Sequence, residues 1–219
     1  MSIPHELIIF DCDGVVVDSE PIGNRVFRGF LAELGLSFSE QQVYERFLGR
    51  AFADSLVIVE ELLGRAVPAE VIDRYKQTRD HTLREEVKAV DGVMELVRDL
   101  GVPYCIASAG DHDKMRATLG ATGLLQLFEG RIFSTTEVPR AKPAPDVFLH
   151  AAATMGVDPK RTAVVEDTVN GVMAARSAGM TAYGYAGLTP AVRLAEAGAH
   201  TTFEHMRELR ALLGLGLAR

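Results

Sequence analysis

The chain of 219 residues has only two cysteines and contains no long apolar run. The cysteines, Cys12 and Cys105, fall within expected buried strands, so we predict two small core side chains and no disulfide. Without a run of about 18 apolar residues, no membrane span is expected. The first residues also lack the basic and apolar regions of a signal peptide. We therefore expect a cytoplasmic protein in a reducing compartment.

Positive charge is also in deficit, because 23 Lys and Arg residues face 30 Asp and Glu residues, for a net charge of −7. An acidic chain does not favour a nucleic-acid backbone as its main partner. The sequence contains no internal repeat and no low-complexity segment. No heptad pattern or large patch defines the oligomeric state, and our expectation is a monomer or a weak homo-oligomer.

The strongest signal that is present is a short apolar run, residues 7–10, that ends in Asp11, Asp13 and Gly14. In a strand the side chains of Asp11 and Asp13 lie on the same side, because successive side chains alternate. Two carboxylates placed there repel each other and raise one pKa. A divalent cation relieves that repulsion, and oxygen ligands suit Mg²⁺. The pattern therefore predicts a metal-assisted site at the end of this strand.

The second half of the chain alternates strands with helices. This pattern predicts a parallel, doubly wound α/β sheet. The expected strands are residues 7–10, 103–107, 131–133, 162–165 and 181–185, the last being the final strand that the pattern predicts.

Residues 18–87 show helical periodicity only. Ser39 is predicted to cap one helix, Asp54 to cap the next, and Gly64 to end it. We therefore predict a core domain of residues 1–17 and 88–219, with residues 18–87 inserted as an all-helical cap.

Polar residues end three of the predicted strands. They are Asp11 with Asp13, Ser108, and Glu166 with Asp167. Ligands of doubly wound sheets bind at the carboxyl ends of the strands, so these residues are expected to converge on one site. A helical insert that begins just after the first strand is placed to cover that site.

Four motifs stand in order: Asp11-x-Asp13, Ser108, Lys142-Pro143 and Glu166-Asp167. Together they resemble the haloacid dehalogenase superfamily of phosphatases, in the beta-phosphoglucomutase and phosphoglycolate phosphatase branch, whose helical cap is inserted after the first motif. The resemblance covers essentially the whole chain. It implies a Rossmann-like core and Mg²⁺-dependent phosphoryl transfer.

The resemblance and the chemistry of the residues agree on the roles of the first motif. Asp11 would be the nucleophile, since a carboxylate can carry the phosphoryl group as an aspartyl-phosphate. Asp13 would protonate the leaving alcohol and then take a proton from the attacking water. The Asp11 side chain and the Asp13 backbone carbonyl would also bind Mg²⁺.

The other motifs would hold the phosphoryl group and the metal. Ser108 and the backbone N–H of Ala109 would donate hydrogen bonds to phosphoryl oxygens, and Lys142 would neutralise their charge. Asp167 would bind Mg²⁺, while direct ligation by Glu166 is left open. Glu166 and Asp167 could instead favour the positive end of the next helix.

Substrate choice is expected to come from the cap, because the core handles only phosphate. Arg50 follows a helix break at Leu48-Gly49 and is the first candidate, with Arg25 second and Glu20 as a further candidate. An arginine there could pair with the carboxylate of a phosphorylated sugar acid. The segments 113–115, 148–152 and 201–205 resemble the 6-phosphogluconate phosphatase type within this branch.

We therefore predict a phosphatase of a small phosphorylated metabolite, a sugar phosphate or sugar-acid phosphate. The first alternative is a beta-phosphoglucomutase-type mutase, but Gly23 stands where the mutase has a cap histidine. The second is a non-enzymatic phospho-acceptor of the receiver type, which lacks such a cap and the second acid. A cysteine-phosphatase loop is excluded because no arginine stands six residues after either cysteine. A serine nucleophile elbow is excluded because Ile106 replaces its leading glycine.

Overall fold

The apolar run Leu7–Phe10 forms strand β1 at the centre of a six-stranded sheet in the computed structural model. The structure describes residues 5–215, so the ends of the predicted core ranges, residues 1–4 and 216–219, lie outside the described residues. All four residues of β1 are buried, because helices cover both faces of the sheet. This is why the run is continuously apolar.

The sheet has the order β3-β2-β1-β4-β5-β6, and every neighbouring pair is parallel. The remaining strands are β2 (Tyr104–Ser108), β3 (Ile132–Ser134), β4 (Thr162–Glu166), β5 (Thr181–Tyr185) and β6 (Thr201–Phe203). The prediction that β5 is the last strand was wrong. Only Phe203 of β6 is buried, so three residues give too little alternation to mark a strand.

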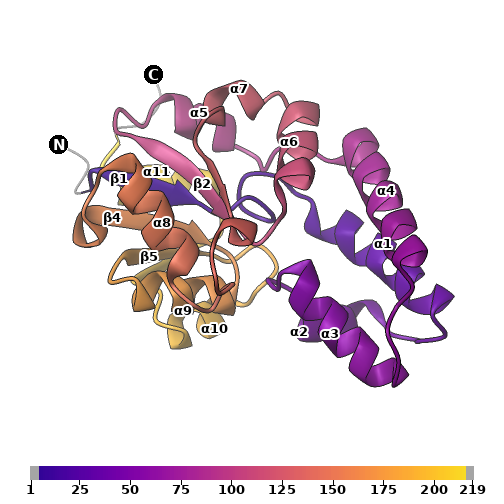
Figure 1. Cartoon of the computed structure of the whole chain (residues 1–219). Helices are drawn as coiled ribbons and strands as arrows, with labels where there is room; N and C mark the ends of the chain where they lie inside the picture. Colours follow the sequence, from indigo (N-terminus) through magenta and orange to yellow (C-terminus); the bar gives the residue numbers. More distant parts are fainter. Residues whose placement is uncertain (1–4, 216–219) are drawn as a thin grey trace.

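Two layers of helices enclose this sheet (Figure 1). Alternate residues of the strands point to opposite faces, so Ile8 and Phe10 pack in one core cluster while Leu7 and Ile9 pack in the other. The first face is covered by α5 (Val93–Arg98), α6 (His112–Ala121), α7 (Leu125–Phe128) and α11 (Met206–Leu212). The second is covered by α8 (Asp146–Met155), α9 (Val169–Ser177) and α10 (Ala191–Glu196). Two 3₁₀ turns, η1 (Thr135–Glu137) and η2 (Pro159–Arg161), complete the core.

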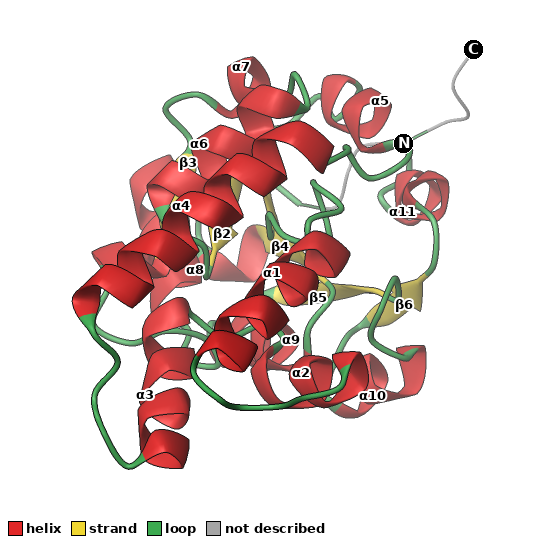
Figure 2. Cartoon of the chain, turned by 90° about the vertical axis from the view of Figure 1, so that its right-hand side faces the viewer, coloured by secondary structure: helices red, strands yellow, loops and turns green. Residues whose placement is uncertain are grey.

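The predicted helical insert is a separate group of four helices beside the sheet (Figures 1 and 2). They are α1 (Glu20–Glu33), α2 (Glu40–Phe47), α3 (Phe52–Leu63) and α4 (Ala69–Glu86). The group has its own aromatic core, in which Phe52 stacks on Tyr75 with ring centroids 5.1 Å apart and Phe27 packs edge-on against Phe47. Since it buries apolar surface of its own, this cap can hold its shape as a unit.

Local signals set most of the cap's helix ends. Ser39 forms a capping box with Gln42 at the start of α2, as its position predicted. Gly64 ends α3 in the left-handed conformation. The expected cap at Asp54 was wrong, because α3 already begins at Phe52 after the extended residue Ala51. A capping residue one turn too late in the sequence is a common error when no hydrogen-bond geometry is available.

The chain enters and leaves the cap through two segments that lie side by side. Val17 forms an antiparallel bridge with Ala89, and the Asp18 N–H donates to the Lys88 carbonyl at 2.9 Å. The pairing places both crossings between core and cap at one edge. Domain boundaries at 17/18 and 87/88 stay a prediction that this geometry favours.

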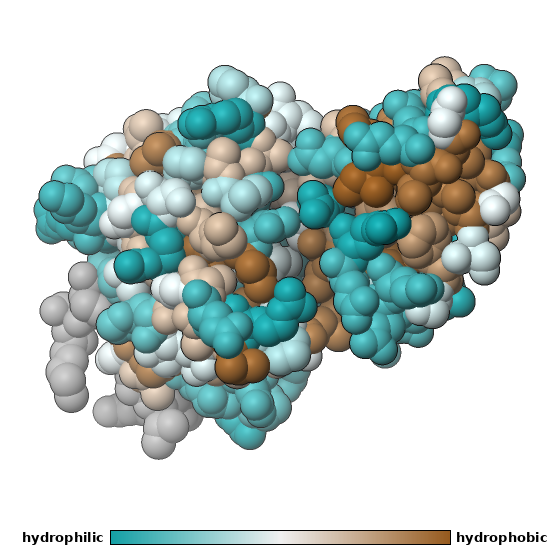
Figure 3. Space-filling view, turned by 90° about the horizontal axis from the view of Figure 1, so that it is seen from below, coloured by the Kyte–Doolittle hydropathy of each residue, from teal (hydrophilic) through white to brown (hydrophobic). Residues whose placement is uncertain are grey.

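The space-filling view shows the core and the cap as two masses joined across a narrower region (Figure 3). Hydrophobic side chains gather on the cap in this view. Exposed large apolar side chains on α3 are Val57 and Leu62. Within residues 5–215, no helix combines the length and apolarity needed to cross a membrane.

Candidate active site

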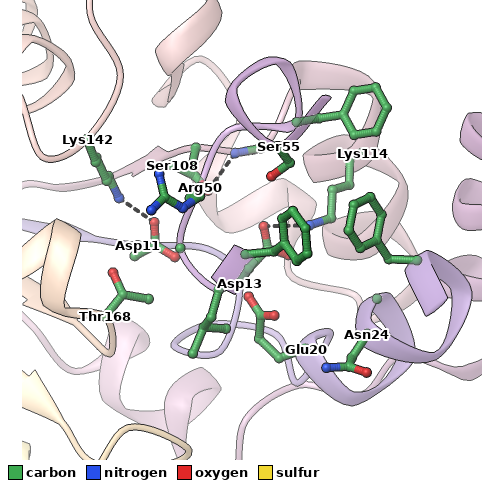
Figure 4. Close-up of a pocket in the computed structure, with 18 of the residues that line it drawn as sticks. Asp11, Asp13, Glu20, Asn24, Arg50, Ser55, Ser108, Lys114, Lys142 and Thr168 are labelled. Carbon is green, nitrogen blue, oxygen red and sulfur yellow. Dashed lines mark hydrogen bonds and ion pairs between the residues drawn. The ribbon is translucent and has the colours of Figure 1, made fainter. Parts of the chain in front are cut away.

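The polar strand ends converge on one pocket between the core and the cap, with a volume of about 140 Å³ (Figure 4). Asp11 and Asp13 follow β1, Ser108 ends β2 and Glu166 ends β4. The neighbouring parallel strands bring these residues together, as the sequence predicted. The core side of the pocket is lined by Asp11, Asp13, Ser108, Ala109, Gly110, Asp111, Lys114, Lys142, Glu166 and Thr168.

Lys142 lies at the floor of this pocket between two carboxylates. Its Nζ donates to Asp11 Oδ1 at 2.5 Å, to Glu166 Oε1 at 2.7 Å and to the Ala107 carbonyl at 3.1 Å. Burial opposes the charged form, but Asp11 and Glu166 hold the pKa of Lys142 above its ordinary value. A buried, permanently charged ammonium beside Asp11 can neutralise an incoming dianion.

Glu166 is held by the protein on both oxygens. Besides Lys142, it accepts hydrogen bonds at Oε2 from the backbone N–H and the hydroxyl of Thr168, each at 2.9 Å. A Cβ at Gly171 would lie 1.8 Å from the Glu166 carboxyl carbon, so α9 needs glycine at this position. The geometry assigns Glu166 to orienting Lys142 and gives no support to direct metal ligation.

Asp13 is held by two donors from different elements. Lys114 Nζ of α6 lies 2.8 Å from Asp13 Oδ2, and the Ser19 hydroxyl donates to Asp13 Oδ1 at 2.5 Å. Burial acts to raise the pKa of Asp13, but Lys114 and Ser19 hold that pKa below its ordinary value. Asp13, the second acid of the motif, is therefore the ionised partner of Lys114 in this conformation.

Asp167 differs from its neighbours because one of its oxygens lacks a partner. Among residues 5–215, buried side-chain oxygens without a hydrogen-bond partner are Asp167 Oδ1 and Asn24 Oδ1. The backbone of Gly14 comes so close to Asp167 that a Cβ there would lie 2.1 Å from Oδ2, and Gly14 has a φ of +80°. A buried, unpartnered carboxylate oxygen beside Asp11 fits a hard cation that takes oxygen ligands.

The carboxyl groups at the floor resist ionisation. Burial raises the pKa of Asp11 to about 7, against the lowering charge of Lys142. Burial, Glu166 and Asp11 raise the pKa of Asp167 well above its usual range. Among residues 5–215, no three His, Cys, Asp or Glu side chains are arranged to hold a metal by themselves. A Mg²⁺ ion here would combine the two carboxylates with the Asp13 carbonyl and water.

The phosphate-binding residues predicted from β2 also line the pocket. Ser108 is buried, and its hydroxyl accepts from the Gly110 N–H at 3.1 Å. Ala109 follows it at the pocket wall, where its carbonyl accepts from the Thr135 hydroxyl. These two hydrogen bonds hold the loop after β2 in place.

Two of the three predicted cap residues reach the pocket. Arg50 lines it (Figure 4). Its Nε donates to the Arg46 carbonyl at 2.9 Å. Glu20 lines it at the start of α1, where burial and the charge of Asp13 raise its pKa to about 7. Arg25 points elsewhere, in an exposed ion pair with Glu86 at 2.7 Å. The geometry gives no support to Arg25 as a substrate contact.

Sequence reasoning missed several residues of this site. Lys114 lies six positions after Ser108 on a helix with an ordinary mixture of charges, so nothing marks it as a partner of Asp13. Thr168 lines the pocket and also caps α9, where its hydroxyl accepts from the Gly171 N–H. Asn24 of α1 donates to the Glu40 carbonyl at 3.1 Å and lines the pocket on the cap side. These contacts join distant segments, which periodicity does not reveal.

A family model described as haloacid dehalogenase-like hydrolase matches residues 5–179. The chain therefore belongs to the haloacid dehalogenase-like hydrolases, as its motifs predicted. It is 30% identical over 205 residues to the 6-phosphogluconate phosphatase of Escherichia coli (strain K12), which covers 93% of this chain and 92% of that relative. Membership in a hydrolase family with phosphatase relatives confirms the prediction of an enzyme.

Solved structures share both the core and the cap. One is a conserved haloacid dehalogenase-like protein of unknown function from Agrobacterium tumefaciens, with 38% identity and a TM-score of 0.81 over 96% of this chain and 98% of that one. Another is a putative beta-phosphoglucomutase from Thermotoga maritima, with 26% identity and a TM-score of 0.75 over 96% of this chain and 100% of that one. The likeness confirms the predicted α/β core with an inserted helical cap.

Proposed function

We propose that the protein is a Mg²⁺-dependent phosphatase of a small phosphorylated sugar or sugar acid. The observation that carries the proposal is one pocket in which Asp11 contacts Lys142 while Asp13, two residues on, is held separately by Lys114. Two carboxylates in different surroundings can take different roles. The pairing supports a nucleophile and an acid/base in one site.

The first half of the reaction transfers the phosphoryl group to the protein. An Asp11 oxygen attacks phosphorus, the new Asp11–phosphorus bond forms, and the bond from phosphorus to the leaving oxygen breaks. Asp13 is an ion-paired carboxylate in the free protein, so it must be protonated when the substrate is bound. It then gives that proton to the leaving oxygen, and the product leaves as a neutral alcohol. Lys142, Ser108 and the backbone N–H of Ala109 stabilise the charge on the phosphoryl oxygens.

The second half returns the protein to its starting state. Asp13, now a carboxylate, takes a proton from water as the water oxygen bonds to phosphorus. The Asp11–phosphorus bond breaks, and inorganic phosphate leaves. Asp13 keeps the proton for the next substrate. The same two carboxylates therefore serve both steps, Asp11 as the phosphoryl carrier and Asp13 as the acid and then the base.

The metal fits the carboxylates of Asp11 and Asp167 together with the carbonyl of Asp13. The support is the unpartnered Asp167 oxygen and the close backbone of Gly14. When bound, Mg²⁺ supplies charge neutralisation for the carboxylates and the phosphoryl oxygens. Lys142 and the backbone donors then orient the group for attack by Asp11.

Stability of the metal-free protein is expected to fall as pH rises from about 5 to about 8. The pKa values of Asp11 and Glu20 are raised to about 7, and that of Asp167 is raised well above its usual range, whereas the unfolded values lie near 4. The folded state therefore keeps protons that the unfolded state releases, and the free energy of unfolding drops over this range.

Thermal unfolding in a chelator at several pH values measures this effect. Mg²⁺ should raise the Tm more at pH 8 than at pH 5.5, because it binds the ionised carboxylates. The Asp167→Asn variant should show a flatter pH dependence and a smaller response to Mg²⁺. A metal-free Tm that rises steadily from pH 5.5 to pH 8 would contradict the assignment.

The substrate class rests on the cap side of the pocket. Phe27, Phe47, Phe52 and Tyr75 provide an apolar wall, with Asn24 and Ser55 as polar groups. A volume of about 140 Å³ supports a small leaving group, not a macromolecule. Arg50 is the cation we propose for a carboxylate or a second polar group of the substrate. The E. coli relative is a 6-phosphogluconate phosphatase, which supports sugar-acid phosphates as first compounds to assay.

The proposal is tested by phosphate release from p-nitrophenyl phosphate, 6-phosphogluconate and glucose 6-phosphate, with Mg²⁺ and with chelator. We expect Mg²⁺-dependent release and a phosphoryl group on Asp11 in acid-quenched protein, located by mass spectrometry. No release from any compound, or a phosphoryl group elsewhere, would overturn it.

The mutase alternative predicts isomerisation without phosphate release. Gly23 supports the hydrolase, because it lines the pocket and glycine has no side chain that could act there as an acid or base. Assaying interconversion of glucose 1-phosphate and glucose 6-phosphate separates the two activities.

A further inference from the structure

We propose that Lys114 is a positioning residue for Asp13, and that Arg79 of the cap anchors the helix turn that carries Lys114. The inference rests on the proposed phosphatase function and adds a link from the cap to the acid/base. Figure 4 shows Lys114 reaching from its helix to Asp13.

The Asp13 carboxylate is fixed by one donor on each oxygen. Lys114 Nζ holds Oδ2 at 2.8 Å and the Ser19 hydroxyl holds Oδ1 at 2.5 Å. Because the two donors lie on different sides, they set the plane of the carboxylate. The loop after β2 limits it further, since a Cβ at Gly110 would lie 3.2 Å from Asp13 Oδ2. The hydrogen bond from the Lys114 ammonium is expected to be the stronger of the two, because its donor is charged.

Lys114 pairs with Asp13 and not with the carboxylates that hold Lys142. Its side chain is 19% exposed and lines the pocket, whereas Lys142 is committed to Asp11 and Glu166. The two lysines thus divide the two catalytic carboxylates between them. Lys114 should therefore affect proton transfer by Asp13, whereas Lys142 should affect transfer of the phosphoryl group to Asp11.

The turn that carries Lys114 is tied to the cap by one aspartate. Asp111 caps α6 by accepting from the Lys114 backbone N–H at 2.8 Å with Oδ1. Its other oxygen accepts from Arg79 of α4 at 3.2 Å. Arg79 is itself only 5% exposed and is also paired with Asp80 at 2.7 Å. The contacts run without a gap from the cap through Asp111 and Lys114 to Asp13.

The test exploits the fact that only alcohol leaving groups need a proton. For Lys114→Met we expect kcat/KM for glucose 6-phosphate, or for 6-phosphogluconate if wild type prefers it, to fall roughly 100-fold. The value for p-nitrophenyl phosphate should stay within about threefold, because nitrophenolate leaves unprotonated. The comparison uses kcat/KM because this constant reports only the steps up to release of the alcohol. Hydrolysis of the aspartyl-phosphate comes later and does not affect it.

Three further variants separate positioning from folding. Lys114→Arg should recover most of the alcohol-substrate activity, since it keeps a charged donor. Arg116→Met, on the exposed side of the same helix, should leave both substrates unchanged. When Asp13→Asn is already present, adding Lys114→Met should lower kcat/KM for the alcohol substrate by less than about threefold, because the two residues act as a unit. Thermal unfolding of each variant reports its fold.

Arg79→Met should lower kcat/KM for the alcohol substrate about tenfold and leave the value for p-nitrophenyl phosphate unchanged, which is a weaker form of the effect expected for Lys114→Met. An equal loss for both substrates in Lys114→Met would overturn the positioning role while leaving the phosphatase proposal intact. Additive losses of Lys114→Met and Asp13→Asn would do the same. If wild type releases phosphate from no compound, both proposals fail.

Discussion

Replacing Asp11 with asparagine is expected to lower phosphate release by roughly 10⁴-fold or more, because the amide cannot carry the phosphoryl group. The change keeps the shape of the side chain at the end of β1. Lys142 retains Glu166 as a charged partner. Since burial raises the pKa of Asp11 to about 7, the ionised carboxylate is costly in the metal-free protein, and the amide should not reduce its stability.

Loss of activity with an unchanged Tm would therefore mark a chemical role. Asp73→Asn, on the exposed side of α4, is the matched control and should keep wild-type rates. Asp11→Ala is a second variant, because the asparagine of Asp11→Asn can deamidate slowly to aspartate and restore activity, whereas alanine cannot. Asp167→Asn separates the metal from the nucleophile, since that variant is expected still to form the aspartyl-phosphate at high Mg²⁺. Turnover by Asp11→Ala at a rate near wild type would disprove the mechanism.

The fold was largely predictable because its main signals are local. A continuous apolar run such as Leu7–Phe10 indicates a strand covered on both faces, and Ser39 marks a helix start through bonds made within one turn. β6 escaped prediction because three residues with one buried side chain carry no periodicity. The start of α3 was misplaced because Ala51 caps without a side-chain bond.

The site divides along the same line. Asp11, Ser108 and Glu166 were predicted together because parallel strands must end at one edge of the sheet, which is a rule of topology. Lys114 and Arg79 could not be predicted, because their importance depends on which helix faces the pocket. Arg25 and Arg50 were both candidates, yet only Arg50, in the loop between α2 and α3, lines the pocket, while Arg25 of α1 pairs with Glu86. Side-chain direction on a cap helix follows from tertiary packing.

The contact between cap and core is itself specific. Gly49, with a φ of +71°, brings the loop after α2 so close to Thr168 that a Cβ would lie 2.8 Å from the threonine side chain. Thr168 in turn holds Glu166, which holds Lys142. The break at Leu48-Gly49 therefore also brings the cap against Thr168, one of the residues that hold Glu166 and through it Lys142.

Replacing Lys142 with methionine is expected to damage both stability and activity. The change leaves Asp11 and Glu166 buried without their shared cation, and breaking a buried ion pair in this way costs about 3–5 kcal/mol of unfolding free energy. Activity should fall by at least roughly 10²-fold, because no other charge replaces the ammonium at the phosphoryl oxygens. Urea denaturation and phosphate release measure the two effects.

A second substitution separates the two losses. Adding Glu166→Gln to Lys142→Met removes the unpaired carboxylate while the amide oxygen can still accept from Thr168, so much of the stability should return. Activity should not return, because the cation is still missing. Lys160→Met, on the exposed turn η2, is the control for losing a lysine. Recovery of activity together with stability would show that Lys142 serves only the fold, whereas a stable, inactive double variant places it in the chemistry.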